Sequence, residues 1–163
     1  MKRKSGFTLL ELLVAATIMG ALAVLATVSY RHSAMETRIA AAKLRTEVLA
    51  RAVQRFRLDY GSDKLPSAGV ELVGPDSIVE CNPTSADVLS LFNCGYLQND
   101  GGWRDGYIQY YVCNGNRTTI GTACKNSTIN KPLACMRGRN WSKVPEKYKV
   151  PYAYCVNETS QGE

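Results

Sequence analysis

The sequence predicts an α+β protein in which one long N-terminal helix packs on a small antiparallel sheet of about four strands. Three observations lead to this fold class. An apolar run opens the chain of 163 residues, an amphipathic helical pattern extends it to residue 60, and short strand-like segments follow, together with all six cysteines. A chain of this length has room for one membrane helix and one small domain, so we expect a single head formed by residues 61–163.

The first element is the apolar run at residues 7–30. At about 1.5 Å rise per residue, a helix of this length exceeds a hydrocarbon core of roughly 30 Å. Basic residues at positions 2–4 precede the run, and only Arg31 follows it closely. The positive-inside rule therefore places the N-terminus in the cytoplasm and the bulk of the chain outside.

Glu11 is the only charged residue within this run. A carboxylate inside a membrane helix costs roughly 2.5–3.5 kcal/mol on insertion scales, so it usually has a partner or a role. An ordinary secretory signal would explain the basic start, and residues 21–23 would fit its small-x-small cleavage pattern. That interpretation gives Glu11 neither a partner nor a role, and the alternative of a plain signal anchor gives it neither.

The residues around Glu11 support a third interpretation. Residues 4–15, "KSGFTLLELLVA", resemble the class III signal of type IV pilins and of their relatives, the pseudopilins of type II secretion. In that family a short basic leader ends in Gly, and prepilin peptidase cuts after it on the cytoplasmic face. The new N-terminal residue, usually Phe, is methylated on its amine, and a Glu follows as the fifth mature residue. Gly6, Phe7 and Glu11 match these places one by one.

The resemblance implies a pilin fold and a division of the chain into four parts. A leader at residues 1–6 is cleaved, residues 7–30 form a transmembrane and assembly helix, residues 31–60 continue it as an amphipathic helix, and residues 61–163 form a disulfide-stabilised head. It also implies a single-pass prepilin in the inner membrane. This prepilin is processed by prepilin peptidase and polymerised with identical or related pilins by inner-membrane assembly machinery, into a surface or periplasmic filament.

In such a filament, as the resemblance implies, Glu11 of one subunit meets the Phe7 amine of a neighbour. Both ions are already desolvated, so the pair adds little net stability. A subunit in the wrong register leaves a bare charge buried, and we therefore expect Glu11 to set the register of assembly. Many pilins carry a Pro where this chain has Val28, so we expect a straighter helix in which Gly20 is only a weak breaker.

Residues 31–60 predict that the helix continues beyond the membrane, because they contain neither Pro nor Gly and Gly61 provides a stop. We expect its apolar face to pack on the chain's own head. A homomeric coiled coil is the alternative, but Ala and Thr make a poor seam for it. The charged residues between Arg38 and Arg57 fill the other faces, which we expect to be solvated. The apolar face consists of Met35, Ile39, Ala42, Thr46, Leu49, Val53, Phe56 and Tyr60.

The C-terminal half predicts a small mixed domain. Residues 61–77 have the composition of a loop, residues 84–92 predict a short helix capped by Thr84 or Ser85, and residues 99–106 predict a turn. Short strands are predicted at residues 107–113, which give the clearest signal, and at residues 118–124, 132–138 and 152–157.

The six cysteines all lie in the second half of the chain, and none forms a CxxC pair. This spacing argues against a zinc site and against a thioredoxin-like redox pair. An even number of widely spaced cysteines in a small domain beyond a membrane segment predicts disulfides in an oxidising compartment. The sequence does not fix their pairing, but we expect neighbours along the chain to pair, Cys81 with Cys94 most clearly. The candidates are Cys81, Cys94, Cys113, Cys124, Cys135 and Cys155.

Several single residues carry weaker hypotheses. Asp100 and Asp105 flank a Gly-rich turn, and some pseudopilins bind calcium in a C-terminal loop. The EF-hand spacing is absent, however, so we expect no metal and no cofactor. His32, the only histidine, fits a surface position better than a ligand or a base. Four N-x-[ST] patterns, which we expect to be unused in a bacterial chain, lie at Asn116, Asn126, Asn140 and Asn157.

A basic segment near the C-terminus interleaves cations with aromatic rings, a pattern that can hold DNA or an anionic surface. A solvated loop is the simpler interpretation. The net charge of +6 is weak evidence for nucleic acid, because positions 2–4 supply three of the charges. The candidate patch consists of Arg137, Arg139, Trp141, Lys143, Lys147 and Lys149.

The sequence contains no HExxH, P-loop or GxSxG motif, so we do not expect an enzyme. The leading hypothesis is a structural subunit, a major or minor type IV pilin. A pseudopilin of type II secretion is the second. A tip pilin that binds DNA or a surface through residues 137–149 is the third, and a secreted enzyme or inhibitor behind an ordinary signal is the fourth.

Overall fold

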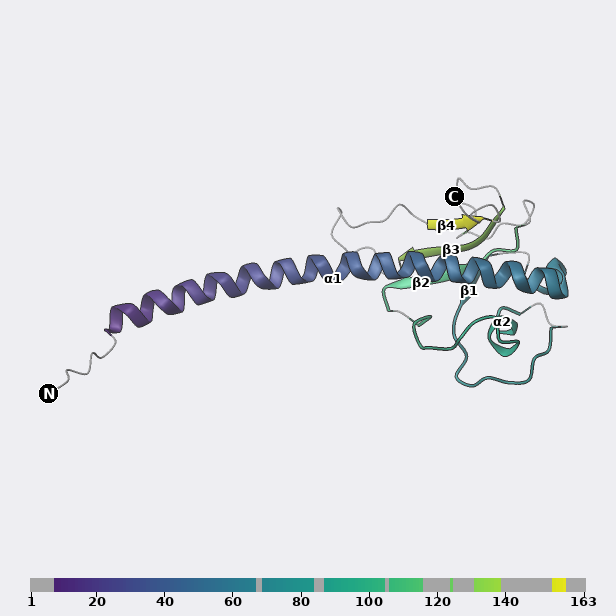
Figure 1. Cartoon of the computed structure of the whole chain (residues 1–163), viewed down its shortest axis with the longest axis horizontal. Coiled ribbons are helices and arrows are strands. Elements are labelled where there is room, and N and C mark those ends of the chain that lie inside the picture. Colours follow the sequence, from purple (N-terminus) through teal and green to yellow (C-terminus); the bar gives the residue numbers. More distant parts are fainter. Residues whose placement is uncertain are drawn as a thin grey trace. The chain divides into compact units, whose positions relative to one another are not determined.

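The computed structural model describes residues 8–66, 69–83, 87–104, 106–115, 124, 131–138 and 154–157, without the side chain of His32. The elements in chain order are α1 (Leu9–Tyr60), η1 (Ser62–Lys64), β1 (Val70–Leu72), α2 (Ser90–Asn93), β2 (Ile108–Val112), β3 (Pro132–Gly138) and β4 (Tyr154–Asn157) (Figure 1). The chain divides into two compact units, residues 1–39 and residues 40–163. The division leaves residues 40–60 of α1 in the same unit as the sheet.

The first unit contains the apolar part of α1. The helix passes Gly20 and Val28 without interruption, as expected for a run without Pro. An 18-residue window of α1 has a mean hydropathy of 2.3, and none of that window is buried. By length and composition, α1 is therefore able to cross a membrane.

In the second unit, one face of α1 packs on the head, which confirms the predicted amphipathic continuation. Ala42, Thr46, Leu49, Val53 and Phe56 are at most 2% exposed. The hydroxyl of Thr46 donates to the carbonyl of Ala42 over 2.9 Å, which satisfies the polar group of this face. Because the head covers this face, it is not available as the seam of a coiled coil.

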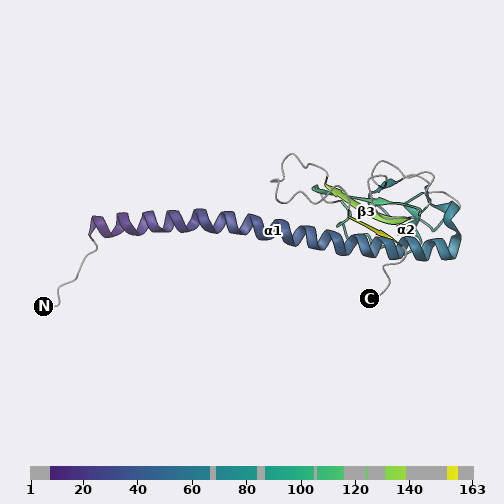
Figure 2. The same ribbon diagram turned by 90° about the horizontal axis from the view of Figure 1, so that it is seen from above.

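The sheet is a four-stranded antiparallel meander in the order β1-β2-β3-β4, and α1 runs along one of its faces (Figures 1 and 2). Tyr110, Met136 and Tyr154 are register partners on β2, β3 and β4, so their side chains share a face. The hydroxyl of Tyr154 donates to Glu47 of α1 over 3.2 Å, which identifies this face as the one toward the helix. The sequence therefore predicted the α+β class correctly.

The opposite face of the sheet carries two disulfides. Cys113–Cys124 and Cys135–Cys155 are buried together with Tyr111 packed against them, and the sulfurs of Cys113 and Cys135 lie 3.7 Å apart. The two bridges thus cover the side of the sheet that α1 leaves open. The third disulfide, Cys81–Cys94, closes a loop before α2. All three join neighbours along the chain, as expected, and they compensate for the small core of such a domain.

Charged residues of α1 bind the rest of the head, so the expectation that the charged residues between Arg38 and Arg57 are solvated is wrong for Arg45 and Glu47. Arg45 donates to the carbonyl of Gly102 over 2.5 Å. Glu47 accepts from Tyr154, and Asp59 accepts from the hydroxyl of Tyr96. These partners lie 37 to 107 residues away in sequence, which is why the helix pattern alone did not predict them.

Two elements differ from the sequence prediction. β1 lies within the predicted loop at residues 61–77, because its three residues pair with β2 although Gly and Pro surround them. The predicted helix at residues 84–92 is shorter: α2 begins at Ser90, and the side chain of Asp87 accepts from the N–H of Leu89 over 3.1 Å. This local bond favours a turn over another helical residue.

Other predictions fall on residues that the structure does not describe. The proposed helix caps Thr84 and Ser85 lie outside the described residues. So do residues 118–123 of the predicted strand at residues 118–124. Cys124, the one residue of this segment that the structure describes, is helical, so the strand prediction is wrong there. The strand predictions at residues 107–113, 132–138 and 152–157 are confirmed by β2, β3 and β4.

The buried face of α1 predicts a strong contrast between two leucines of the same helix. Leu49 is 0% exposed and Leu44 is 63% exposed. We expect Leu49→Ala to lower the free energy of unfolding of the head by about 2–5 kcal/mol. Leu44→Ala is the matched control and should change it by no more than about 0.5 kcal/mol. Urea titration of the full chain in detergent, followed by the fluorescence of buried Trp103, measures both, and equal effects would contradict the packing.

The Tyr96–Asp59 bond predicts a loss of stability at high pH. Desolvation of the phenol and its bond to the Asp59 carboxylate raise the pKa of Tyr96. The bond therefore contributes fully below the ordinary tyrosine pKa of about 10, and its contribution is lost as the pH rises above that value. Tyr96→Phe should flatten the decline in unfolding free energy above pH 10, whereas Tyr107→Phe should leave the wild-type slope. Urea titrations over this pH range test the difference.

Candidate functional site

The candidate site is the N-terminal end of α1, where Thr8 and Glu11 bond to each other. The N–H and the hydroxyl of Thr8 each donate to Oε2 of Glu11 over 3.0 Å. The N–H of Glu11 donates back to the hydroxyl of Thr8 over 3.3 Å. Thr8 directly precedes the first helical residue, and Glu11 is the third residue of the helix. This arrangement is a capping box.

The capping box gives Glu11 a role within a single chain that the sequence analysis missed. The sequence does contain the signal of a capping box, because a Thr followed three residues later by Glu before an apolar run is typical of a helix start. The carboxylate accepts from the backbone N–H of Thr8, the Thr8 hydroxyl accepts from the N–H of Glu11, and the carboxylate lies at the positive end of the helix dipole. Glu11 and Thr8 together therefore cap the start of the helix.

Apolar side chains surround this carboxylate, and the chain itself does not cover them. Leu9, Leu10, Leu12 and Leu13 are between 58% and 83% exposed. An exposed apolar surface of this extent requires lipid or the apolar surface of other chains. Gly6 and Phe7, the predicted processing residues, lie outside the described residues.

The structure argues against the calcium hypothesis at Asp100. One oxygen of this carboxylate accepts from the N–H of Gly102 over 2.9 Å, and the other lies 3.3 Å from the guanidinium of Arg45. A bound cation would have to displace the arginine from this carboxylate. Asp105, the second proposed ligand, is not among the described residues.

The other sequence candidates are mostly not described. Arg137 is half-buried on β3, and Asn157 ends β4. The rest of the basic patch, three of the four N-x-[ST] asparagines and the His32 side chain lie outside the described residues: Arg139, Trp141, Lys143, Lys147, Lys149, Asn116, Asn126 and Asn140.

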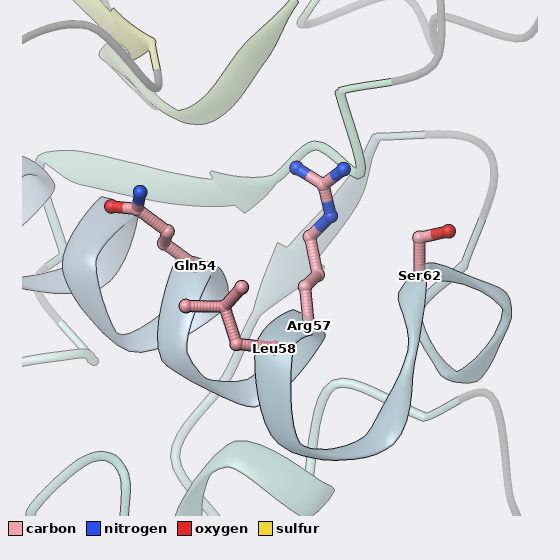
Figure 3. Close-up of a pocket in the computed structure, with 4 residues that line it drawn as sticks. All are labelled: Gln54, Arg57, Leu58 and Ser62. Carbon is pink, nitrogen blue, oxygen red and sulfur yellow. The ribbon is translucent and has the colours of Figure 1, made fainter.

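A group of cysteine sulfurs and a pocket at the end of α1 are two further candidates for a ligand site. The sulfurs of Cys113, Cys124 and Cys135 lie within 4.8 Å of one another, but all three belong to disulfides and are not thiolate ligands. A pocket of about 260 Å³ at the C-terminal end of α1 is lined by Gln54, Arg57, Leu58 and Ser62 (Figure 3). The described residues of this lining include no carboxylate or imidazole that could act as a general base.

The capping box predicts a local effect of Thr8→Ala. Losing an N-cap costs about 0.5–2 kcal/mol of helix stability, so the first turn of α1 should open more often. Thr17→Ala is the control, because Thr17 only donates from within the helix to the carbonyl of Val14. Amide hydrogen exchange of the full chain in micelles should show faster exchange at Leu12 and Leu13 in the first variant alone. Unchanged exchange would refute the capping role.

Comparison with known proteins bears on this same segment. Residues 1–27 match the family model described as the prokaryotic N-terminal methylation motif. Searches of curated proteins and of solved structures found no match. The motif is that of structural subunits, and it implies processing by prepilin peptidase and polymerisation of pilins in general. An apolar helix behind such a motif is consistent with anchoring in the inner membrane. The chain carries a class III prepilin signal and is type IV pilin-like.

Proposed function

We propose that this protein is a structural subunit of a type IV pilus. It enters the inner membrane as a prepilin, is cleaved after Gly6, is N-methylated at Phe7 and polymerises through α1. The observation that carries the proposal is the methylation motif at residues 1–27, joined to a helix whose apolar window the chain leaves completely exposed. In the filament, the packed helices of neighbouring subunits bury this exposed apolar surface of α1.

Glu11 has two successive tasks in this proposal. In the single chain it caps α1 through Thr8. A carboxylate offers about four acceptor sites, so two bonds from Thr8 leave capacity for a further donor. In the filament that donor is the Phe7 ammonium of a neighbouring subunit. Because an unpaired buried charge costs several kcal/mol, only the register that pairs both ions is populated.

A pseudopilin of type II secretion is the second candidate, because the same motif and the same exposed helix serve a periplasmic filament equally well. The three disulfides of the head favour the pilus, since the resemblance implies that a disulfide-bounded C-terminal region is common in pilins. Immunolabelling of intact cells separates the two candidates, because a pilus lies outside the outer membrane.

The mass of the mature N-terminus tests the processing steps. Protein isolated from cells that contain prepilin peptidase should begin with a methylated Phe7. A chain that begins at Val24, or one that retains residues 1–6, would rule out the proposed pathway.

Substitutions at Thr8 and Glu11 distinguish the capping of α1 from the proposed role of Glu11 in setting the register of assembly. Glu11→Ala should leave processing intact and reduce the yield of sheared filaments by about tenfold or more, because the buried ammonium loses its partner. Thr8→Ala removes the cap but keeps the carboxylate, and Glu36→Ala removes an exposed carboxylate outside the apolar run. Both controls should assemble. An equal loss in Thr8→Ala and Glu11→Ala would assign the effect to capping alone.

A further inference from the structure

One exposed surface lies on α1, on the side away from the sheet. Leu44, Val48, Arg51, Arg55 and Leu58 follow each other at steps of three and four, so they form one stripe along the helix. The three aliphatic side chains are each at least 50% exposed. We call these five residues the helix surface. Along the stripe, the two guanidinium groups lie between Leu44 and Val48 on one side and Leu58 on the other, and all three aliphatic side chains are uncovered.

A second exposed surface lies on the irregular segment after β1. Val73, Ile78 and Val79 are 45–60% exposed, and the same segment carries the exposed carboxylates of Asp76 and Glu80. We call these five residues the loop surface. It has the same make-up as the helix surface, three aliphatic side chains and two charges, but the charges are of opposite sign.

The loop surface is held in place although it has no regular secondary structure. Arg104 donates from Nε to the carbonyl of Gly74 over 2.8 Å and from Nη1 to Asp76 over 2.7 Å. Asn99 donates to the carbonyl of Pro75 over 2.7 Å. The Cys81–Cys94 disulfide closes the segment at its far end. A segment ordered in advance loses little entropy on docking, which favours a binding role.

The charges of the two regions are complementary well beyond these residues. Residues 40–57 contain five basic residues and one acidic residue, whereas residues 59–100 contain seven acidic residues and one basic residue. Within the head, some of these charges are already used: Arg51 lies 3.9 Å from Glu47, and Asp76 binds Arg104. Among the described residues, neither Arg55 nor Glu80 has an ion-pair partner, so both are available to another molecule.

We propose that the loop surface of one subunit docks on the helix surface of a second copy of this chain. This inference rests on the proposed function of the protein as a filament subunit. It identifies a contact between the heads of two neighbouring subunits. The two surfaces consist of different residues, so the contact is heterologous. Each docked pair leaves one helix surface and one loop surface unfilled, and the contact therefore repeats along an open polymer. The contact buries the exposed aliphatic residues of both surfaces, and the charges that lie between and beside them meet charges of opposite sign.

Photo-crosslinking in the full chain tests the contact directly. A benzophenone amino acid replaces Val48 in cells that carry prepilin peptidase and assembly machinery. Mass spectrometry of sheared filaments should find it joined to residues 73–80 of another copy. The same amino acid in place of Tyr107, an exposed apolar position outside both surfaces, is the control and should give no such adduct. An adduct to the helix surface of a second copy, or filaments without an adduct, would overturn the inference.

A charge exchange tests whether complementarity drives the docking. Arg55→Glu and Glu80→Arg should each lower filament yield by about tenfold, because like charges then face each other. The combined variant should recover the yield to within about threefold of wild type, a result that a folding defect cannot produce. Lys131→Glu makes the same charge change outside both surfaces and should assemble normally. Equal losses in the single and combined variants would contradict the pairing.

The two proposals fail in different ways. If a mature, methylated chain forms filaments but the crosslink and the charge exchange give negative results, the head contact is wrong and the filament function stands. If the wild-type chain is never processed or never polymerises, both proposals are wrong.

Discussion

The burial of one face of α1 is the constraint on which the rest of the head depends. A helix that presents Leu49, Val53 and Phe56 on one side must cover them, and the sheet provides that cover. The charged residues that flank this face then attach the loops and the outer strand to the helix, through Arg45, Glu47 and Asp59. The same helix therefore organises the sheet by apolar contact and the irregular segments by hydrogen bonds.

The sheet has a second face, which is turned away from α1 and carries two disulfides. β3 is the third strand of the four, and six of its seven residues are buried. On the side away from α1, its Cys135 lies in the cluster formed by two disulfides and Tyr111. A disulfide is a compact apolar group, so two adjacent bridges act as part of a second core layer. They also restrict the unfolded chain, which a head of this size needs more than a large domain does.

The sequence predicted those features that depend on a local repeat. The spacing from Ala42 to Phe56 predicted the buried face, because burial along α1 follows the helical period, and the Tyr, Ile and Val content of residues 107–113 predicted the strand β2. It did not predict that Arg45 and Glu47 hold distant segments, since a charged residue on a helix looks the same whether its partner is water or a loop more than fifty residues away. For Glu11, a lone charge in an apolar run predicted a partner in another chain, and the structure adds a bond to Thr8 within the same chain. The processing residues and the basic patch remain predictions.

The capping box changes the physical argument about Glu11 and does not compete with assembly. An apolar helix that ends in a membrane has backbone donors in its first turn, and the helix dipole adds a partial positive charge there. Cleavage before Phe7 would add a full positive charge at the same end. One carboxylate three residues into the helix offsets the first two effects immediately and has acceptor capacity for the third. A helix start without this carboxylate would leave an ammonium beside a positive helix end, both without a counter-charge. The position of Glu11 thus follows from the electrostatics of the single chain, and in the proposed filament the neighbouring subunit would make use of a charge that the helix already requires.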